Sequence, residues 1–144
     1  MTDKPNKAQV GKIGEDTASR WLESKGYKII ERNYWKKWGE IDIVARRDDP
    51  TKDGGSILHF IEVKSVSRRA KPVGGESGDN PIETDYLAED NVHPWKLKRL
   101  SRAIQTYLLE RKINEEQVWQ IDVLTLELDF ATRRAKVKLL PDVG

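Results

Sequence analysis

Two short stretches, Gly39-Glu40-Ile41-Asp42 and Phe60-Ile61-Glu62-Val63-Lys64, decide the fold of this chain. Each stretch places charged residues within or beside an apolar run, residues 41–45 and residues 57–63, that is typical of a β-strand. The segment between the two runs, residues 48–55, is dense in Asp, Gly, Pro and Thr, which favour turns. The sequence therefore predicts an antiparallel hairpin with a carboxylate inside each strand.

The register of this hairpin brings two carboxylates together. Pairing the strand ends across the turn places Asp42 opposite Ile61 or Glu62. In the register that keeps the charges on one face, the Asp42 and Glu62 side chains begin roughly 5 Å apart. Lys64 shares the face of Glu62, because side chains alternate along a strand. Two carboxylates at this distance repel each other, and a divalent cation relieves the repulsion. We therefore predict a site for a hard metal ion with a lysine beside it.

The alternative for this cluster is a salt-bridged patch on an exposed face of the sheet. Against it, Val44, Leu58 and Phe60 have the same parity as the charged residues, so this face is expected to be largely buried. A buried charge is costly without a partner, and a half-buried cluster of two acids and a lysine is typical of a functional site. Glu40 is expected to point to the opposite face from Asp42 and to be structural.

Composition excludes several classes of protein. With 144 residues, of which 37% are hydrophobic and 35% charged, a single polar-surfaced domain with its own core is expected over residues 1–144. No apolar run approaches the roughly 20 residues that cross a bilayer, and no apolar signal core follows the N-terminus. The chain has no cysteine, which excludes disulfides and thiolate chemistry, so a cytoplasmic protein without membrane partners is expected. The net charge of +2 gives no general electrostatic case for nucleic acid, so the positions of the charges decide.

The rest of the chain predicts two helices and three further strands. Helical spacing of apolar residues predicts helices over residues 7–25 and 94–112. Strands are predicted over residues 27–30, 118–128 and 135–140, with a long loop at about residues 65–92. The last strand is an edge that a homodimer can use, although its alternating lysines discourage pairing. The order αβββαββ predicts an α/β fold with a central mixed five-stranded sheet flanked by helices.

Basic residues are concentrated in two stretches of the chain and in an aromatic corner, residues 34–38. Acids are absent from residues 63–75 and 91–109, and four cations at the start of the second helix indicate an anionic partner. A solvated face balanced by acids upstream explains them equally well. The aromatic corner can stack on bases, although packing is the commoner role of such aromatics. The candidate nucleic-acid-binding residues are Arg68, Arg69, Lys71, Lys96, Lys98, Arg99, Arg102, Lys36, Lys37 and Trp35.

Together these motifs resemble the PD-(D/E)XK nuclease arrangement, in which Glu-x-Lys follows an Asp by about twenty residues and a helix with a Glu precedes both. More narrowly, the chain is similar to the bacterial UPF0102 (YraN) family, distant relatives of archaeal Holliday junction resolvases. The matching pieces are Gly11-x-x-Gly14-Glu15 with Ala18, Gly26-Tyr27, Glu31-Arg32-Asn33, Gly39-Glu40-Ile41-Asp42, Phe60-Ile61-Glu62-Val63-Lys64, Lys96 with Arg99-Leu100, and Ile121-Asp122-Val123. Residues 72–91, and Gln120 where an arginine is expected, depart from the pattern.

The resemblance implies a restriction-endonuclease-like core in which Asp42, Glu62 and Lys64 are catalytic and Glu15 is an accessory acid. On spacing alone, an ordinary rim glutamate explains Glu15 equally well. Asp42, Glu62 and the Val63 carbonyl would hold Mg²⁺, or Mn²⁺ in its place. The implied reaction is hydrolysis of phosphodiester bonds in DNA, with little sequence preference and with branched or single-stranded DNA as candidate substrates.

Two other functions stay open at this point. One is a non-catalytic module that binds DNA or a protein partner on the same fold. The intact acid and lysine cluster argues against it, because a scaffold does not need so costly a group of charges. The other is a small-molecule phosphohydrolase, which is disfavoured because the basic residues form two separate stretches rather than one compact pocket.

Overall fold

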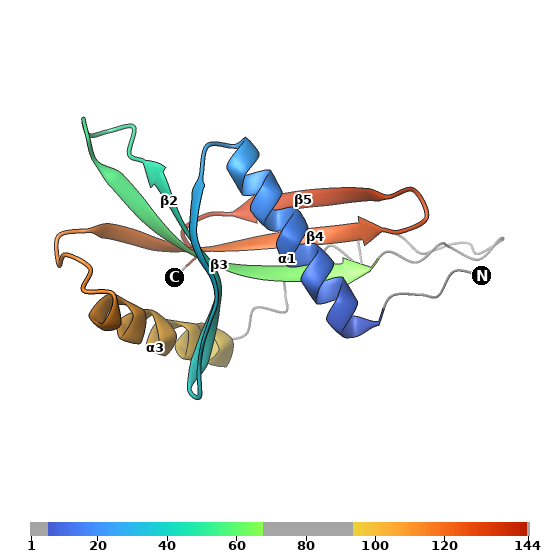
Figure 1. Cartoon of the computed structure of the whole chain (residues 1–144), viewed down its shortest axis with the longest axis horizontal. Helices are drawn as coiled ribbons and strands as arrows, with labels where there is room; N and C mark the ends of the chain where they lie inside the picture. The colour runs from blue at the N-terminus through green and yellow to red at the C-terminus, as the bar shows by residue number, and fades with distance from the viewer. Residues whose placement is uncertain (1–5, 68–93, 144) are drawn as a thin grey trace.

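The computed structural model describes residues 6–67 and 94–143, which form a five-stranded sheet with two helices packed against it (Figure 1). The elements are α1 (Lys7–Ser24), β1 (Lys28–Lys36), β2 (Gly39–Asp48), β3 (Ser56–Ser67), α3 (Pro94–Glu110), β4 (Val118–Asp129) and β5 (Arg134–Leu140). This is the predicted order αβββαββ, so the α/β class and the restriction-endonuclease-like core are confirmed.

The strands lie in the order β1-β2-β3-β4-β5, and only β3 and β4 run parallel. The pairing of β2 with β3 runs from Asp48 opposite Ser56 to Ile43 opposite Ile61. Continued by one residue, this register brings Asp42 opposite Glu62, as predicted. Beyond that level β2 continues along β1, while β3 continues along β4 to Ser67. The middle of the sheet therefore forks at Asp42 and Glu62.

Both helices begin and end close to the predicted positions. Asn6 caps α1 through a reciprocal pair of 2.8 Å hydrogen bonds, in which each of Asn6 and Gln9 donates its backbone N–H to the other's side-chain oxygen. The helix ends at Ser24, and Gly26 adopts the positive φ of 95° that turns the chain into β1. The second helix, α3, ends at Glu110 rather than at residue 112.

Three strands are longer than predicted, and β2 spans Gly39–Asp48 rather than residues 41–45. β1 continues to Lys36, so the aromatic corner is the end of a strand and the turn into β2; pairs such as Trp35 with Glu40 hold it there. β3 continues to Ser67 because β4 pairs with it up to Leu128, which turns the first part of the predicted loop into strand. Residues 68–92 of that loop lie outside the described residues.

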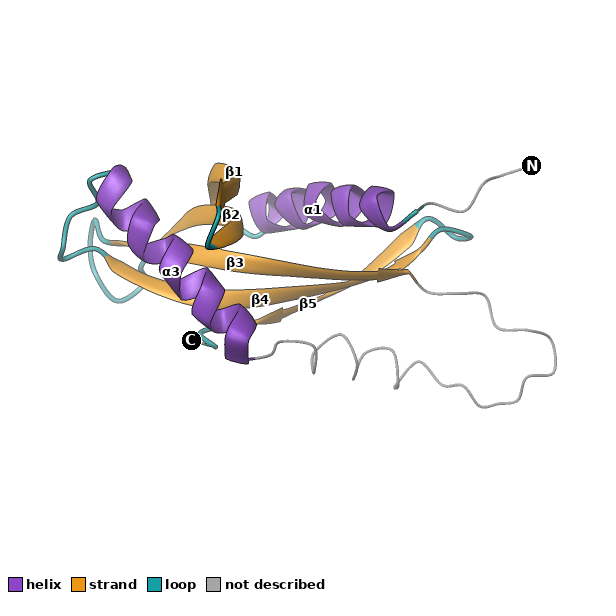
Figure 2. Ribbon diagram, turned by 90° about the horizontal axis from the view of Figure 1, so that it is seen from below, coloured by secondary structure: helices purple, strands orange, loops and turns teal. Residues whose placement is uncertain are grey.

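Figure 2 shows the helices α1 and α3 lying against the sheet. Alternation along the strands sends apolar side chains into two cores, one packed against each helix. Val44 and Phe60 pack with α3, whereas Ile43 and Ile61 pack with α1. The expected burial of Val44, Leu58 and Phe60 is confirmed, since none is more than 1% exposed. No helix in the described parts of the chain is long and apolar enough to span a membrane.

Candidate active site

Asp42 lies at the fork between β2 and β3. Its side chain is 9% exposed, and its Oδ2 accepts a 2.8 Å hydrogen bond from the Val63 N–H of β3. The N–H and C=O of one residue point to the same edge of an extended strand. The Val63 carbonyl is therefore directed toward the same side as its N–H, which is the position that a metal ligand at this site requires.

The β1–β2 hairpin changes face at the level of Asp42. Arg32 reaches α1, whereas Tyr34 packs in the core under α3. On the partner strand, Ile43 packs under α1 and Ile41 under α3. Residues two apart share a face of a regular strand, so both strands switch faces between these positions. The predicted alternation of faces along β2 therefore holds at Val44 but is interrupted at Asp42.

Asn33 accounts for the switch. Its neighbours pair as Arg32 with Ile43 and Tyr34 with Ile41, which places Asn33 opposite Asp42. Asn33 has a φ of 55°, in the left-handed region that asparagine tolerates better than most residues. A single left-handed residue interrupts the alternation of β1 at the level where β2 leaves β3.

Burial and electrostatic repulsion shift the pKa values of the two central acids, Asp42 and Glu62. Burial, followed by the charge of Glu62, raises the pKa of Asp42 to about 8. Burial also raises the pKa of Glu62, although Lys96 and Lys64 oppose this effect. The Nζ atom of Lys96, in the first turn of α3, lies 3.9 Å from Glu62 Oε2. The predicted pair of carboxylates therefore forms, and its excess negative charge is only partly balanced.

Lys64 lies in the same cluster, as the alternation along β3 predicts. Burial and the neighbouring Lys96 ammonium lower its pKa to about 8, while Glu62 and Asp42 oppose the shift. A lysine with this pKa is a mixture of ammonium and amine near neutral pH, so it can both stabilise negative charge and accept a proton.

Glu15 approaches the cluster from α1. Burial raises the pKa of its carboxyl group, and the guanidinium of Arg32, whose Nη2 is 3.7 Å from Glu15 Oε1, opposes the shift. The charge of Glu15 in turn raises the pKa of both Asp42 and Glu62. The fourth acid of the sequence prediction is therefore close enough to act on the other two.

The prediction for Glu40 was wrong. The charge of Glu40 raises the pKa of Asp42, Glu62 and Glu15, so this residue is not remote from the site. Glu40 thus belongs to the electrostatic surroundings of the site. Glu40 lies two residues from Asp42, but the switch of faces at Asp42 means that the period-two rule alone could not have placed it.

The donor set fits magnesium. Mg²⁺ is usually held by one or two carboxylates and keeps several waters. Asp42 and Glu62 provide two carboxylates whose repulsion a cation would relieve, and the Val63 carbonyl adds a neutral oxygen. Among the described residues no group of three or more His, Cys, Asp or Glu side chains forms a complete ligand set, so Glu15 acts at longer range.

The basic residues of α3 divide into two groups. Lys96 is half-buried against Glu62, whereas Lys98, Arg99 and Arg102 are exposed. This end of α3 lies close to β2, because Gly39 packs on the backbone of Arg99 and a Cβ at position 39 would collide with the Arg99 carbonyl oxygen. The exposed cations therefore lie beside the strand that carries Asp42.

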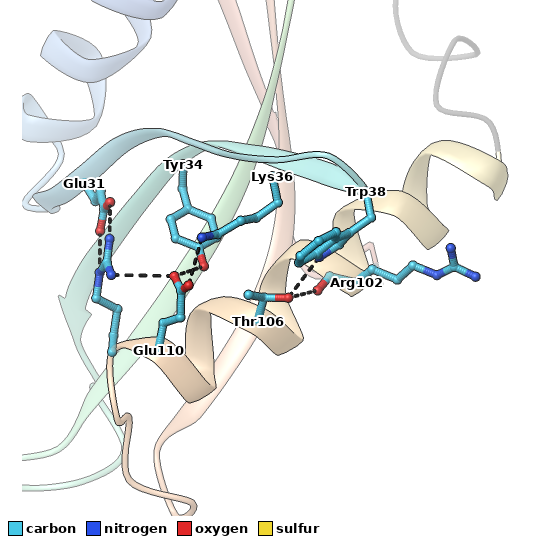
Figure 3. A network of polar contacts seen from close by, with 8 residues as sticks. Glu31, Tyr34, Lys36, Trp38, Arg102, Thr106 and Glu110 are labelled. Carbon is cyan, nitrogen blue, oxygen red and sulfur yellow. Dashed lines mark hydrogen bonds and ion pairs between the residues drawn. The ribbon is translucent and has the colours of Figure 1, made fainter.

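Several side chains of the aromatic corner form contacts with α3 (Figure 3). Glu110 of α3 accepts hydrogen bonds from Tyr34 Oη at 2.6 Å and from Lys36 Nζ at 2.8 Å. Trp38 Nε1 donates to Thr106 Oγ1 at 2.9 Å. Lys36, a predicted nucleic-acid contact, is thus held in an ion pair within the fold.

The other predicted contacts have different positions. Trp35 is 64% exposed, and Lys37 in the turn is exposed as well. Arg68, Arg69 and Lys71 lie outside the described residues. The structure thus leaves Trp35 and Lys37 open at the end of the hairpin, beside the exposed start of α3.

Comparison with known proteins agrees with the motifs. A model of the "uncharacterised protein family UPF0102" matches residues 14–126, which include Glu15 and both central acids. A UPF0102 protein of Campylobacter fetus is 33% identical over 131 residues, covering 91% of this chain and 89% of the relative. One from Helicobacter hepaticus is 36% identical over 122 residues, covering 85% and 87%, and one from Campylobacter jejuni is 32% identical over 119 residues, covering 83% and 84%. The chain therefore belongs to the UPF0102 family.

Proposed function

We propose that this protein is a Mg²⁺-dependent endonuclease that hydrolyses phosphodiester bonds in DNA. The observation that carries the proposal is the convergence of two buried carboxylates, Asp42 and Glu62, at a strand fork beside Lys64. Such a cluster is costly to a folded protein, since burial penalises each charge. Groups with strongly shifted pKa values that gather in one place are typical of catalytic sites.

Each residue has a distinct role in this proposal. Asp42 and Glu62, with the Val63 carbonyl, would hold the cation, which would supply a Lewis acid to neutralise charge on a phosphate oxygen. Lys64 orients the attacking water and accepts its proton in the amine form, or stabilises the added negative charge in the ammonium form. The negative charge of Glu15 adds to those of Asp42 and Glu62, so that the site attracts a cation rather than an anion.

DNA suits the charges around the site. Lys98, Arg99 and Arg102 are exposed in the first half of α3, within two turns of Lys96, whose Nζ lies 3.9 Å from Glu62 Oε2. A phosphate backbone held by these cations would bring a phosphodiester to the acids. Contacts of this kind carry no sequence information, so we expect little sequence preference. Exposed Trp35 would stack on an unpaired base, which favours branched or single-stranded DNA in the cytoplasm as substrate.

The direct test is metal-dependent cleavage of four DNA forms: duplex, single strand, flap and four-way junction. We expect cleavage with Mg²⁺ or Mn²⁺, and a fall of about 10²–10³-fold or more in the rate for both Asp42→Asn and Lys64→Ala. The matched control is Asp53→Asn, which makes the same chemical change in the exposed turn of the same β2–β3 hairpin.

Unchanged cleavage in Asp42→Asn would reject the assignment of the site. Tight DNA binding by the wild type without cleavage of any form, with or without metal, would favour the non-catalytic binding module instead. In that case Asp42→Asn would leave DNA affinity unaltered.

A further inference from the structure

Lys96, in the first turn of α3, is placed differently from the other cations of its helix. Its Nζ lies 3.9 Å from Glu62 Oε2, and the two side chains are 33% and 16% exposed. Lys98, Arg99 and Arg102 are exposed to solvent. Lys96, in contrast, is already paired with an acid of the proposed metal site. Within the described parts of the chain, no other ion pair involves either central acid.

A close approach of α3 to β2 holds Lys96 in this place. Gly39 of β2 packs on the backbone of Arg99, and only glycine, which lacks a Cβ, lets the helix come so near the strand. Lys96 lies three residues before Arg99, on the same side of the helix. Asp42 lies three residues after Gly39 on the strand. The start of α3 is therefore fixed beside the strand fork, where the Lys96 ammonium reaches Glu62.

The position of Lys96 has a cost in stability that the fold alone does not explain. A helix start has a partial positive charge, so a lysine there is mildly unfavourable. Partial burial of the ammonium adds a loss of hydration. The ion pair with Glu62 offsets both costs, and Lys96 in turn balances part of the negative charge of the two central acids. One ammonium can balance at most one carboxylate, whereas a divalent cation can balance both.

We propose that Lys96 is the internal counter-ion of the metal-free site, which competes with the divalent cation for Glu62 and contacts a DNA phosphate once the cation is bound. This inference rests on the proposed function, since it takes Asp42 and Glu62 as the residues that hold the cation. An ammonium released from Glu62 remains beside Lys98 and Arg99, which would hold the DNA backbone. Lys96 thus limits the repulsion between the two acids before the metal binds and adds a phosphate contact afterwards.

Calorimetric titration with Mg²⁺ at pH 8 tests the competition without any DNA. Lys96→Met removes the charge and keeps an unbranched side chain, so it should bind Mg²⁺ about three- to tenfold more tightly than the wild type, as expected for the loss of a partly buried competing charge. Lys96→Arg keeps the charge and should bind no more tightly than the wild type. The matched control is Lys98→Met, the same change at an exposed position two residues on, which should leave the Mg²⁺ affinity within about twofold.

DNA binding tests the release of Lys96. In EDTA, fluorescence anisotropy of single-stranded and four-way-junction DNA measures the slope of log affinity against log salt concentration. Lys98→Met should reduce this slope by about 0.7–0.9, the value for one lost phosphate contact, whereas Lys96→Met should leave it unchanged because Lys96 is paired with Glu62. With saturating Mg²⁺, both variants should raise the KM for cleavage. Lys96→Met alone should therefore strengthen the binding of Mg²⁺ and weaken that of DNA.

Three results would overturn the proposal: no gain of Mg²⁺ affinity in Lys96→Met, an equal gain in Lys98→Met, or an equal loss of salt dependence in both variants in EDTA. Melting temperatures check that the variants are folded, and Lys96→Gln replaces Lys96→Met if the latter is not. If the wild type cleaves no DNA but Lys96→Met gains Mg²⁺ affinity, the proposed function fails and the counter-ion role stands. Cleavage by the wild type without that gain means the reverse.

Discussion

Two buried carboxylates lie on the strands that flank β3, and they differ in almost every respect other than burial. Asp122 of β4 is fully buried and accepts hydrogen bonds from His59 Nδ1 at 2.6 Å, from Gln120 Nε2 at 2.8 Å and from the Asp142 N–H at 2.9 Å. Although burial opposes them, these hydrogen bonds leave the pKa of Asp122 below its usual value. Asp42 of β2, in contrast, accepts one hydrogen bond from the described residues, that of the Val63 N–H, and has a pKa raised to about 8.

The difference shows how a structural acid can be told from a functional one. Hydrogen bonds from neighbouring groups compensate the charge of Asp122. The bond from the Asp142 N–H also connects the C-terminal residues to β4. Among the described residues the charge of Asp42 is not compensated in this way, because the strongest charge acting on it, that of Glu62, is also negative. A buried charge that the fold does not satisfy suits a ligand that arrives later, here a divalent cation.

The largest effect expected from this contrast is the loss of stability when Asp122 is substituted. Asp122→Ala leaves the buried His59, the Gln120 amide and a backbone N–H without their acceptor, so it should lower the free energy of unfolding by on the order of 3 kcal/mol. Asp42→Ala should not destabilise the metal-free protein and can stabilise it. Urea unfolding of both variants at pH 8 measures the two values. Equal destabilisation by the two substitutions would break the comparison.

The second effect concerns pH, and the two acids should act with opposite sign. A folded pKa above the unfolded value means that the native state binds the proton more tightly, so the contribution of Asp42 to stability falls as the pH rises from about 4 to about 8. The contribution of Asp122, whose folded pKa is lowered, is present above its unfolded pKa and is lost as the pH falls.

Unfolding of the metal-free protein at pH 5 and pH 9 tests this sign. Asp42→Asn should be more stable relative to the wild type at pH 9 than at pH 5, by at least about 1 kcal/mol. Glu62 remains in both proteins, so the difference between them reports the titration of Asp42 together with its effect on Glu62. A stability difference that is the same at both pH values would show that Asp42 does not titrate between them.

The smallest expected effect is that of substituting Gln120, which stands where the family resemblance predicts an arginine. Its amide supplies one of the three hydrogen bonds to Asp122, so Gln120→Ala should destabilise the protein by about 0.5–1.5 kcal/mol and leave DNA cleavage unchanged. Thermal unfolding together with the cleavage assay checks both statements. A loss of cleavage without a loss of stability would mean that the β4 network also serves the active site.

The Asp42 side of this contrast could be predicted from the sequence, and the Asp122 side could not. Turn-forming residues between two apolar runs fix the β2–β3 hairpin, and a period of two then brings Asp42, Glu62 and Lys64 together. These inferences succeeded because they depend on local geometry and on a short connection. The rule could not place Glu40, because β2 switches faces at Asp42.

The rest depends on contacts between distant parts of the chain or on one dihedral angle. The left-handed φ of Asn33 switches the faces of two strands, and no hydrophobic pattern reveals it. Lys36 is held by Glu110, 74 residues further along the chain, so its sequence neighbours could not show that it is already paired. The hydrogen bonds that identify Asp122 as structural likewise come from β3 and from the C-terminal residues.

The central claim, that the uncompensated charge at the strand fork is built for a divalent cation, is tested most directly by calorimetric titration of the metal-free protein with Mg²⁺ and Mn²⁺ at pH 8. We predict saturable binding to the wild type and to Asp53→Asn, and its loss in Asp42→Asn. Equal binding to Asp42→Asn, or no binding to the wild type, would contradict the claim.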